Sequence, residues 1–453
     1  MTTQTHTAID KAKLTEQLLA AVEARNIQQI KDLFSHLVEE EIAEILESTP
    51  LKERQFLWEA VDSDRQGEIL THTNDEVTAN LLESLTPHEI AGITEDLETD
   101  DIADIVQSLD SSDQQTLLAS LDEVDRNAVE MALTYPEDTA GGIMSTDLIS
   151  IRADVTLDVV LRYLRKLGEL PESTSELFVR DREGKFVGSL KLTVLLTHDE
   201  DTLVKEVLNT RIPAIRAFTP EKEVAHFFEK NDLISAAVVN ENDQIIGRIT
   251  IDDVVDIIRE EAEHAQMASA GLDEDQDIFA PAARAAKRRT FWLGINLLTA
   301  IFASIVIGLF DASIEKIVAL AVLMPIIASM GGIAGTQTAT IVIRALATGK
   351  LARSNSRSLL IKETTVGLFN GVIWAALTGM AVLFWFDDAA LSMIFATAML
   401  INLFAAAFAG AMIPLFLQRM KIDPALASGL MLTTVTDSLG FFVFLGLATI
   451  VLL

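Results

Sequence analysis

The order of hydrophobic and polar residues divides the chain into three stretches with different periods. In residues 14–135, apolar positions recur at intervals of three and four, as in Ile90, Ile93 and Leu97, which is typical of amphipathic helices. Groups of this kind return about every dozen residues, and few β-branched runs interrupt them. We therefore predict an α-helical N-terminal domain built as a stacked array of short helices.

Capping residues mark the expected starts of these helices. Thr86 and Thr99 each stand before an acidic first turn, so both are predicted to be N-caps. Asp100, Asp101 and Asp104 are then expected along one edge of the same helix. Attraction to the helix dipole explains Asp100 and Asp101 well, but it explains Asp104 less well because that residue lies beyond the first turn.

After Tyr135 the pattern changes to alternating strands and helices. Strands are expected at residues 176–180 and 186–190, joined by a turn, and the same order returns at 235–239 and 245–250. The second set follows the first by roughly 60 residues, which predicts a tandem pair of similar α/β modules.

Five long apolar runs, free of charged residues except for one in the last, occupy the last part of the chain. Each is long enough for a membrane-spanning helix, which needs about 20 residues. Basic residues gather before the first run, between the second and third, and between the fourth and fifth. The positive-inside rule therefore predicts a cell-membrane protein with its N-terminus in the cytoplasm and its C-terminus outside. Met1–Lys13 is polar and carries no secretory hydrophobic segment. The predicted spans are Phe291–Phe310, Ile317–Ile343, Thr364–Phe386, Ala389–Gln418 and Ala425–Leu453.

Charge is divided unevenly along the 453 residues. Residues 281–453 contain 12 Lys and Arg against 7 Asp and Glu, a net charge of +5, whereas residues 1–280 contain 23 against 60, a net charge of −37. High acidity is commonly only a soluble surface, but a domain of this charge also attracts cations and is unsuited to nucleic acid. The chain has no cysteine, which fits a cytosolic soluble part.

The fifth span contains a single ionisable residue, Asp437, among several hydroxyls. A lone carboxylate costs roughly 2.5–3.5 kcal/mol on insertion scales, so it is more often functional than accidental. A position near the membrane interface is the alternative. In the second span, helix packing would explain Gly331 and Gly335 but not the adjacent Gln337. Carbonyls, hydroxyls and one carboxylate together suit a mostly hydrated Mg2+.

A carboxylate-rich helix is expected directly after the second α/β module. Asp253, Asp256 and Glu260 are spaced by three and four, so they lie on one helical face. Like charges in this arrangement are destabilising unless a cation or a partner neutralises them, and Mg2+ needs only one or two carboxylates. A solvated helix face is the alternative.

The two modules resemble a tandem pair of cystathionine-β-synthase (CBS) domains over roughly Ser145–Glu261. Such pairs are regulatory, usually dimerise and often bind adenine nucleotides. The family's nucleotide element is retained in the second module as Gly247, Thr250 and Asp253, and is lost in the first. The resemblance implies that the hydroxyl meets phosphate and the carboxylate meets ribose, so that ATP or another adenine nucleotide is a candidate ligand.

The order of parts resembles the MgtE family of magnesium channels and transporters over essentially the whole chain. The matching residues include the segment Tyr135–Gly141, Pro325, the Gly331-Gly332 pair, Asp423-Pro424-Ala425 and Thr436-Asp437. The resemblance implies a multi-domain membrane protein with an acidic helical N-terminal domain, tandem α/β CBS domains, a linker (plug) helix and a five-helix transmembrane domain. The expected boundaries are 1–140, 141–262, 263–289 and 290–453.

The same resemblance implies a homodimer in the lipid bilayer that imports Mg2+ and closes when Mg2+ binds its cytosolic domains. Asp437 matches the pore carboxylate, and Glu363 and Asp423 match acidic residues near the cytosolic pore mouth. The implied regulatory residues are Glu68, Asp100, Asp104, Asp232, Asp253, Asp256 and Glu261. The expected pore-lining residues are Gly331, Gly332, Ile333, Gln337, Thr433 and Thr436.

Two departures from the family pattern bear on function. Ile333 stands where the family has asparagine, which affects ion selectivity, and the family's acidic run after Glu261 is here Ala262–Ala265, with His264 in it. Two other functions remain open on the sequence: a transporter for Co2+ or Mn2+, and a membrane regulator that senses nucleotide without ion flux. An enzyme is not expected, because no nucleophile–base set, phosphate-binding loop or His/Cys metal site is found.

Overall fold

The computed structural model describes residues 17–18, 20–83, 85–95, 97–109, 111–171, 173–268, 270–272, 277–351 and 354–453. Met1–Lys13 and most of the acidic linker run Asp273–Asp277 lie outside these residues. The chain divides into two compact units. Unit 1 comprises residues 1–262 and 275–281, and unit 2 comprises residues 263–274 and 282–453.

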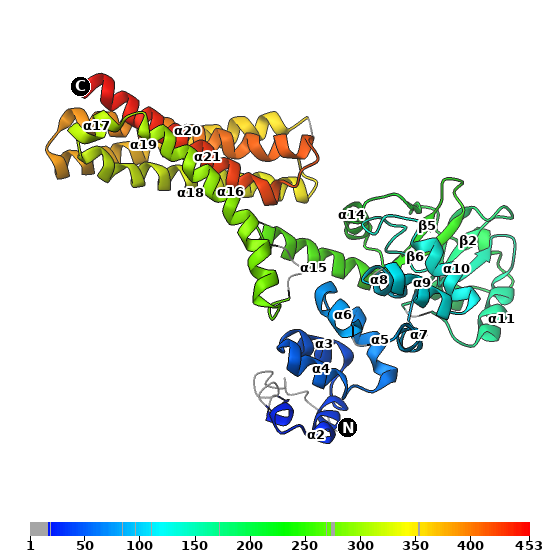
Figure 1. The fold of residues 1–453 in the computed structure, drawn as a ribbon. Coiled ribbons are helices and arrows are strands. Elements are labelled where there is room, and N and C mark those ends of the chain that lie inside the picture. Colours follow the sequence, from blue (N-terminus) through cyan, green and yellow to red (C-terminus); the bar gives the residue numbers. More distant parts are fainter. Residues whose placement is uncertain are drawn as a thin grey trace, which may run out of the picture. The chain divides into compact units, whose positions relative to one another are not determined.

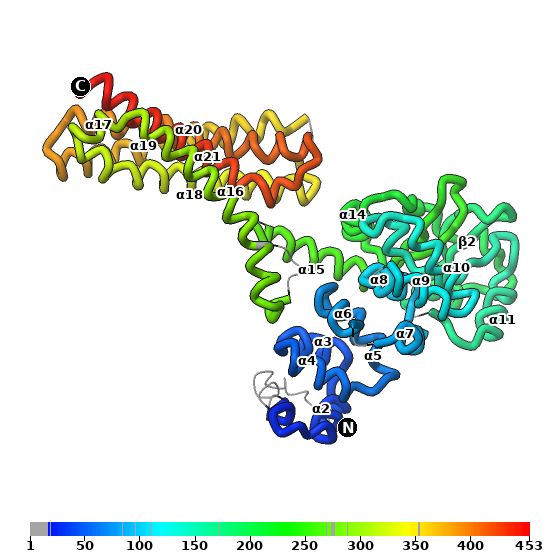
Figure 2. Tube along the Cα trace, viewed as in Figure 1, coloured from blue at the N-terminus to red at the C-terminus, as the bar shows by residue number. Residues whose placement is uncertain are grey.

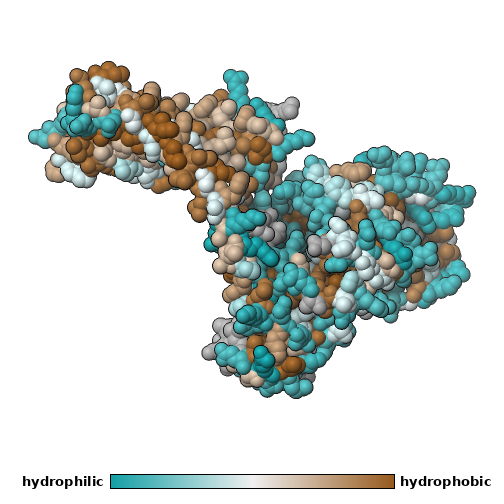
Figure 3. Space-filling model, viewed as in Figure 1, coloured by the Kyte–Doolittle hydropathy of each residue, from teal (hydrophilic) through white to brown (hydrophobic). Residues whose placement is uncertain are grey.

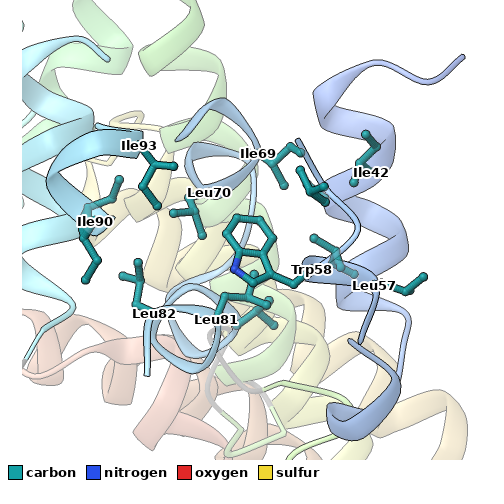
Figure 4. Close-up of a cluster of buried hydrophobic side chains, with 14 of the residues drawn as sticks. Ile42, Leu57, Trp58, Ile69, Leu70, Leu81, Leu82, Ile90 and Ile93 are labelled. Atoms are coloured by element: carbon teal, nitrogen blue, oxygen red, sulfur yellow. The ribbon is translucent and has the colours of Figure 1, made fainter. Parts of the chain in front are cut away.

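Unit 1 begins with an array of short helices, each seven to ten residues long, as the apolar spacing predicted (Figure 1). Trp58 lies at the centre of its hydrophobic core, among residues such as Leu70 and Leu81 from neighbouring helices (Figure 4). The helices are α2 (Ile27–Phe34), α3 (Glu39–Glu47), α4 (Leu51–Trp58), α5 (Ser63–Thr71), α6 (Asp75–Leu82), α7 (Pro87–Ile93), α8 (Thr99–Gln107), α9 (Ser111–Ser120) and α10 (Glu123–Ala132).

One predicted cap is confirmed and another is wrong. Thr86 and Glu89 form a reciprocal capping box at the start of α7. The N-cap of α8 is Glu98, so Thr99 is the first helical residue. The Thr99 hydroxyl is instead hydrogen-bonded to that of Thr146, at 2.8 Å, because tertiary packing offers it a partner outside its own helix.

The predicted strand pairs are confirmed, and they form two three-stranded sheets with the same topology. In each sheet the first strand is parallel to the second, and the second is antiparallel to the third. The first module contains β1 (Ser150–Arg152), α11 (Leu157–Leu167), β2 (Glu176–Arg180), β3 (Phe186–Lys191) and α12 (Leu192–Thr197), and α13 (Val204–Val207) follows it. The second contains β4 (Ile215–Arg216), α14 (Glu221–Asn231), β5 (Ser235–Val239), β6 (Ile245–Thr250) and α15 (Ile251–Ala268).

Among the described residues of unit 2, five helices are long and apolar enough to cross a membrane, as predicted. They pack side by side, with α20 contacting α18, α19 and α21 (Figure 2). Figure 3 shows hydrophobic residues over much of the visible face of these helices, whereas the visible face of unit 1 is largely hydrophilic. The long helices are α16 (Ala282–Gly308), α18 (Ala319–Ala347), α19 (Ser356–Phe386), α20 (Ala389–Arg419) and α21 (Pro424–Leu452), with the short α17 (Asp311–Lys316) after the first.

Candidate ion path and acidic cluster

Polar residues of α21 lie on a side that the other helices of unit 2 leave partly uncovered. Asp437 is partly exposed, and Thr433, one turn earlier, is exposed. The Thr433 hydroxyl donates to the Gly429 carbonyl at 3.0 Å, so this hydroxyl is satisfied within its own helix. The Asp437 carboxylate is the only ionisable group of the span and offers oxygen ligands on that side.

An uncovered stripe on α18 carries three of the predicted pore residues. The Ile333 side chain is 55% exposed, and Gln337, one turn later, is exposed as well. Gly332 has open space beside it. Among the described residues, the Gln337 amide has no hydrogen-bond partner. An unpaired amide is costly against lipid, so this face is better suited to water or to a protein partner.

Two other predicted pore residues are buried inside the subunit instead. Gly331 lies against Asn402 of α20, and a Cβ atom at this glycine would come within 2.4 Å of Asn402 Nδ2. Thr436 is 0% exposed, and its hydroxyl donates to the Thr433 carbonyl at 3.2 Å. In this conformation both residues support the helix packing beside the uncovered side.

Asn402 was not singled out from the sequence, yet it joins the two helices that carry the candidate ion path. Its side chain is fully buried, and Nδ2 donates to the Ile327 carbonyl of α18 at 2.9 Å. Gly331 of α18 and Gly440 of α21 leave room for the amide. An asparagine in the middle of a 31-residue apolar helix was the available signal.

Glu363, predicted at the cytosolic pore mouth, is buried between helices. Its side chain lies beside a small cavity of about 80 Å3 bounded by α18, α19 and α20. Gln337, Thr338 and Asn370 also line this cavity. Lys362 Nζ lies 3.0 Å from Glu363 Oε1, so the carboxylate has a cationic neighbour at the edge of the span.

Asp423 caps the start of α21 and also contacts the end of the linker helix. Its carboxylate accepts a hydrogen bond from the Ala425 amide at 2.8 Å. The other carboxylate oxygen lies 2.8 Å from His264 Nε2, which belongs to the last turns of α15. From the sequence, His264 was noted only because it stands in the segment that replaces the family's acidic run. In the structure it is a partner of Asp423, the predicted pore-mouth carboxylate.

The acidic cluster of unit 1 lies where α8 faces the start of α15. Burial raises the pKa of Asp100 well above its ordinary value, and the charges of Asp253 and Asp101 raise it further. Burial and the charge of Asp253 also raise the pKa of Asp101 to about 7. For Asp253, burial is the main cause of a pKa raised to about 6, opposed by hydrogen bonds from Thr250. These carboxylates therefore repel one another when ionised.

The other predicted regulatory residues differ in their relation to this cluster. Glu68 is close enough to contribute to the raised pKa of Asp101. Burial, Glu137 and Asp101 raise the pKa of Asp104, and burial raises that of Asp256. Glu261 instead forms an ion pair with Lys222. Asp232 lies apart from the cluster, exposed, in the left-handed C-cap of α14.

Arg248 is a member of this region that the sequence did not identify. Its side chain is almost fully buried in β6, and Nη2 lies 2.7 Å from Glu98 Oε1 at the start of α8. The pair joins the N-terminal array to the second module. The available sequence signal was a single basic residue in an otherwise uncharged predicted strand, residues 245–250.

The predicted nucleotide element is occupied by internal contacts. Asp253 Oδ2 accepts hydrogen bonds from the Thr250 amide at 2.8 Å and from the Thr250 hydroxyl at 3.0 Å. A Cβ atom at Gly247 would lie 2.6 Å from Met144 Sδ. The hydroxyl and the carboxylate therefore cap α15 here, and a nucleotide would have to replace these bonds.

Within the described residues, no group of three or more His, Cys, Asp or Glu side chains is arranged to hold a metal ion. Mg2+ retains several of its waters and needs only one or two carboxylates, so pairs drawn from α8 and α15 suit it. In the described part of the chain, Asp100, Asp101, Asp104 and Asp253 have no cationic partner of the kind that Arg248 provides for Glu98.

An acidic helical array, two α/β modules and a bundle of membrane-length helices define a multi-pass membrane protein with a large extramembrane part. Family models match residues 37–138 as the MgtE intracellular N domain, 140–200 and 204–260 as CBS domains, and 324–447 as a divalent cation transporter. The chain is 32% identical to the magnesium transporter MgtE of Thermus thermophilus over 329 residues, 72% of this chain and 73% of that protein.

Two further comparisons also match this chain to MgtE proteins. The magnesium transporter MgtE of Bacillus subtilis is 30% identical over 322 residues, 71% of each chain. The crystal structure of the cytosolic domain of the Mg2+ channel MgtE in complex with ATP matches 54% of this chain and 99% of that one, at 28% identity and a TM-score of 0.50. The chain belongs to the MgtE family.

Proposed function

We propose that this chain forms a homodimeric Mg2+-selective channel or transporter that imports magnesium across the cell membrane and closes when cytosolic Mg2+ binds its acidic domains. One observation carries the proposal: Asp437 is the single ionisable side chain of its span and lies on a partly uncovered side of α21. A carboxylate in that setting suits a cation path. The relatives named as magnesium transporters support Mg2+ as the ion.

The path would run along the uncovered faces of α18 and α21. Gln337 and Thr433 would face the ion's water shell, and Asp437 would supply the charge, because Mg2+ releases its waters reluctantly. A second copy of the chain would enclose these faces and give Gln337 a wet environment. Ile333 on the same stripe would contribute an apolar surface and no ligand. Glu363 and Asp423 would attract Mg2+ at the cytosolic side.

Closure would follow from neutralisation of the acidic cluster. Mg2+ bridging Asp100 or Asp104 of α8 to Asp253 or Asp256 of α15 would offset their repulsion and hold the array against the second module. At ~1–2 kcal/mol per bridge, about three to six bridges over both subunits of the proposed dimer would reach the roughly 5.5 kcal/mol that moves a two-state gate from mostly open to mostly closed. Glu68 and Glu261 would take part at the edges. Asp232 lies apart from the cluster, so it would bind Mg2+ at a separate site.

Two finer statements belong to the same proposal. The basic residues between spans favour a cytoplasmic N-terminus and an external C-terminus. An adenine nucleotide would bind the second module near Gly247, Thr250 and Asp253, for which the relative solved with ATP is the support. Because Asp253 also belongs to the acidic cluster, nucleotide and Mg2+ would influence each other's binding.

The test is Mg2+ flux into proteoliposomes containing the full-length protein. Asp437→Asn keeps the side-chain shape and removes the charge, so most flux should be lost while folding is retained. Flux of Co2+ or Mn2+ but not Mg2+ would favour the alternative substrate. No flux of any divalent ion by the wild type would favour a regulator that does not transport.

Closure needs its own variant and control. Asp253→Asn, Asp256→Asn and Glu261→Gln together should leave flux at high internal Mg2+. The control removes three exposed acidic residues that belong to neither α8 nor α15. These are Glu123, Glu130 and Glu206, each changed to Gln. If both triple variants close like the wild type, the cluster is only a solvated surface. If both fail equally, net charge rather than specific bridging sets closure.

A further inference from the structure

The segment that connects the linker helix α15 to the first membrane helix α16 is anchored to the N-terminal array by a buried ion pair. Arg54 of α4 and Asp277 of this segment form a two-pronged salt bridge, with Nη1–Oδ2 at 2.8 Å and Nη2–Oδ1 at 2.9 Å. Their side chains are 0% and 2% exposed. Both residues belong to unit 1, although 223 positions separate them in the chain.

Further hydrogen bonds support this pair. Arg54 Nε donates to the Leu46 carbonyl at 2.9 Å, which fixes the guanidinium inside the array. The Asp277 amide donates to Glu76 Oε2 at 3.0 Å, and the Phe279 amide donates to Asp277 Oδ1 at 2.8 Å. A buried ion pair is tolerated only when its geometry and remaining hydrogen bonds are this complete, because both charges have left water.

Asp277 lies in the chain just before the first membrane helix, α16. Pro281 ends the anchored segment, and Ala282 is the first residue of α16. Five residues of chain span at most about 17 Å. The start of α16 therefore lies within that distance of Asp277, which the array holds in place. From the sequence, residues 263–289 were expected only as a linker helix, whereas in the structure α15 ends at Ala268 and α16 begins at Ala282.

We infer that the Arg54–Asp277 pair couples the N-terminal array directly to the first membrane helix, in addition to the route through α15. When the array moves, the pair carries the movement to the start of α16. Arg54 and Asp277 are positioning residues and contact no transported ion. This inference rests on the proposed closure by cytosolic Mg2+, because it names a second route by which that closure reaches the membrane.

The contact itself is tested by hydrogen exchange on the full-length protein in detergent. Arg54→Met removes the positive charge and leaves the buried Asp277 carboxylate without a cationic partner. Exchange in the peptide covering residues 277–281 should rise about a hundredfold or more. Arg54→Met combined with Asp277→Leu replaces the ion pair by apolar contact and should restore most of the protection. Arg65→Met is the matched control, because Arg65 pairs with Glu39 elsewhere in the array.

The coupling is tested by the Mg2+ concentration that half-closes the channel in proteoliposomes. Arg54→Met should raise it roughly 2- to 30-fold, the usual range for loss of a coupling contact, and the apolar pair should bring it back. Arg65→Met should change neither readout. The flux of each variant is normalised to its own maximal flux. Loss of folded protein lowers the maximal flux, whereas loss of coupling changes the half-closing Mg2+ concentration.

Three results would overturn the inference. Unchanged exchange in Arg54→Met would mean that the pair does not hold the segment. Raised exchange with an unchanged half-closing concentration would mean that the anchor exists but transmits nothing, and the proposed closure would still stand. Absence of Mg2+-dependent closure in the wild type would remove the proposed function and the coupling with it.

Discussion

The close contact between Gly331 and Asn402 allows a quantitative test of the packing beside the candidate ion path. In Gly331→Ala the new methyl group would start 2.4 Å from Asn402 Nδ2. Ordinary contact begins at 3.4 Å, so one helix or the amide must move by about 1 Å. Moving the amide would also break its hydrogen bond to the Ile327 carbonyl.

These terms set the size of the effect. Overpacking a well-packed interior costs about 1–3 kcal/mol, and loss of the hydrogen bond adds about 0.5–1.5 kcal/mol. Alanine regains up to about 1 kcal/mol over glycine within a helix. The net destabilisation expected for Gly331→Ala is therefore about 0.5–4.5 kcal/mol. Gly332→Ala, whose Cβ would meet open space, should be neutral or slightly stabilising.

Thermal unfolding of the purified protein in detergent is the assay, with Gly440→Ala as an intermediate case. A Cβ at Gly440 would lie 2.9 Å from Asn402 Nδ2, a milder clash than at Gly331. Midpoints should fall in the order Gly332→Ala, Gly440→Ala, Gly331→Ala. Combining Gly331→Ala with Asn402→Ala removes the clash, so the double variant should lose less than the sum of the two single changes.

Two outcomes would refute this reasoning. If Gly331→Ala and Gly332→Ala unfold at the same temperature, the amide does not pack where the structure has it. If the effects of Gly331→Ala and Asn402→Ala simply add, the two residues do not share one contact. Flux is not used as the readout here, because Gly332 is itself predicted to line the path.

Three further predictions concern the acidic cluster, the ion path and the linker helix. The pKa values of Asp101 (about 7) and Asp253 (about 6) are raised, so their ionised forms oppose the folded arrangement above about pH 7 and this penalty vanishes below about pH 4. Without Mg2+, lowering the pH from about 8 to about 5 should therefore increase the resistance of the soluble part to proteolysis. Over the same pH change, the Mg2+ concentration needed for protection should rise, because Mg2+ binds the ionised carboxylates. A Mg2+ requirement independent of pH would contradict this. Ile333→Asn should fold and should shift the ratio of Mg2+ to Co2+ flux, and an unchanged ratio would place Ile333 away from the ions. His264→Ala should weaken Mg2+-dependent closure more than His264→Gln, which keeps a donor for Asp423; equal effects would deny the hydrogen bond a role.

Local periodicity was sufficient to predict most of the architecture. A helix or strand must bury one face, and that requirement is written in the spacing of apolar residues. The repeated strand pairs and the five membrane-length runs therefore appear in the structure near their predicted positions. The lone carboxylate Asp437 was also evident, because the cost of a charge in an apolar run does not depend on neighbouring helices.

Periodicity says that a face is buried, but not which residue covers it. Gly331 and Thr436 were predicted from their motifs to line the pore. Both are buried in the structure, because Asn402 and the neighbouring helices cover that side. Thr99 read as a cap and instead bonds to Thr146.

Contacts between distant parts of the chain depended wholly on the tertiary structure. Arg248 meets Glu98, His264 meets Asp423, and Arg54 meets Asp277 across separations of 150 to 223 residues. Tertiary packing brings the partners of each pair together, and for Arg54 and Asp277 it also takes both charges out of water, where neither is tolerated alone. The sequence determined which segments fold and which cross the membrane, and only the packed chain decided which charges neutralise one another.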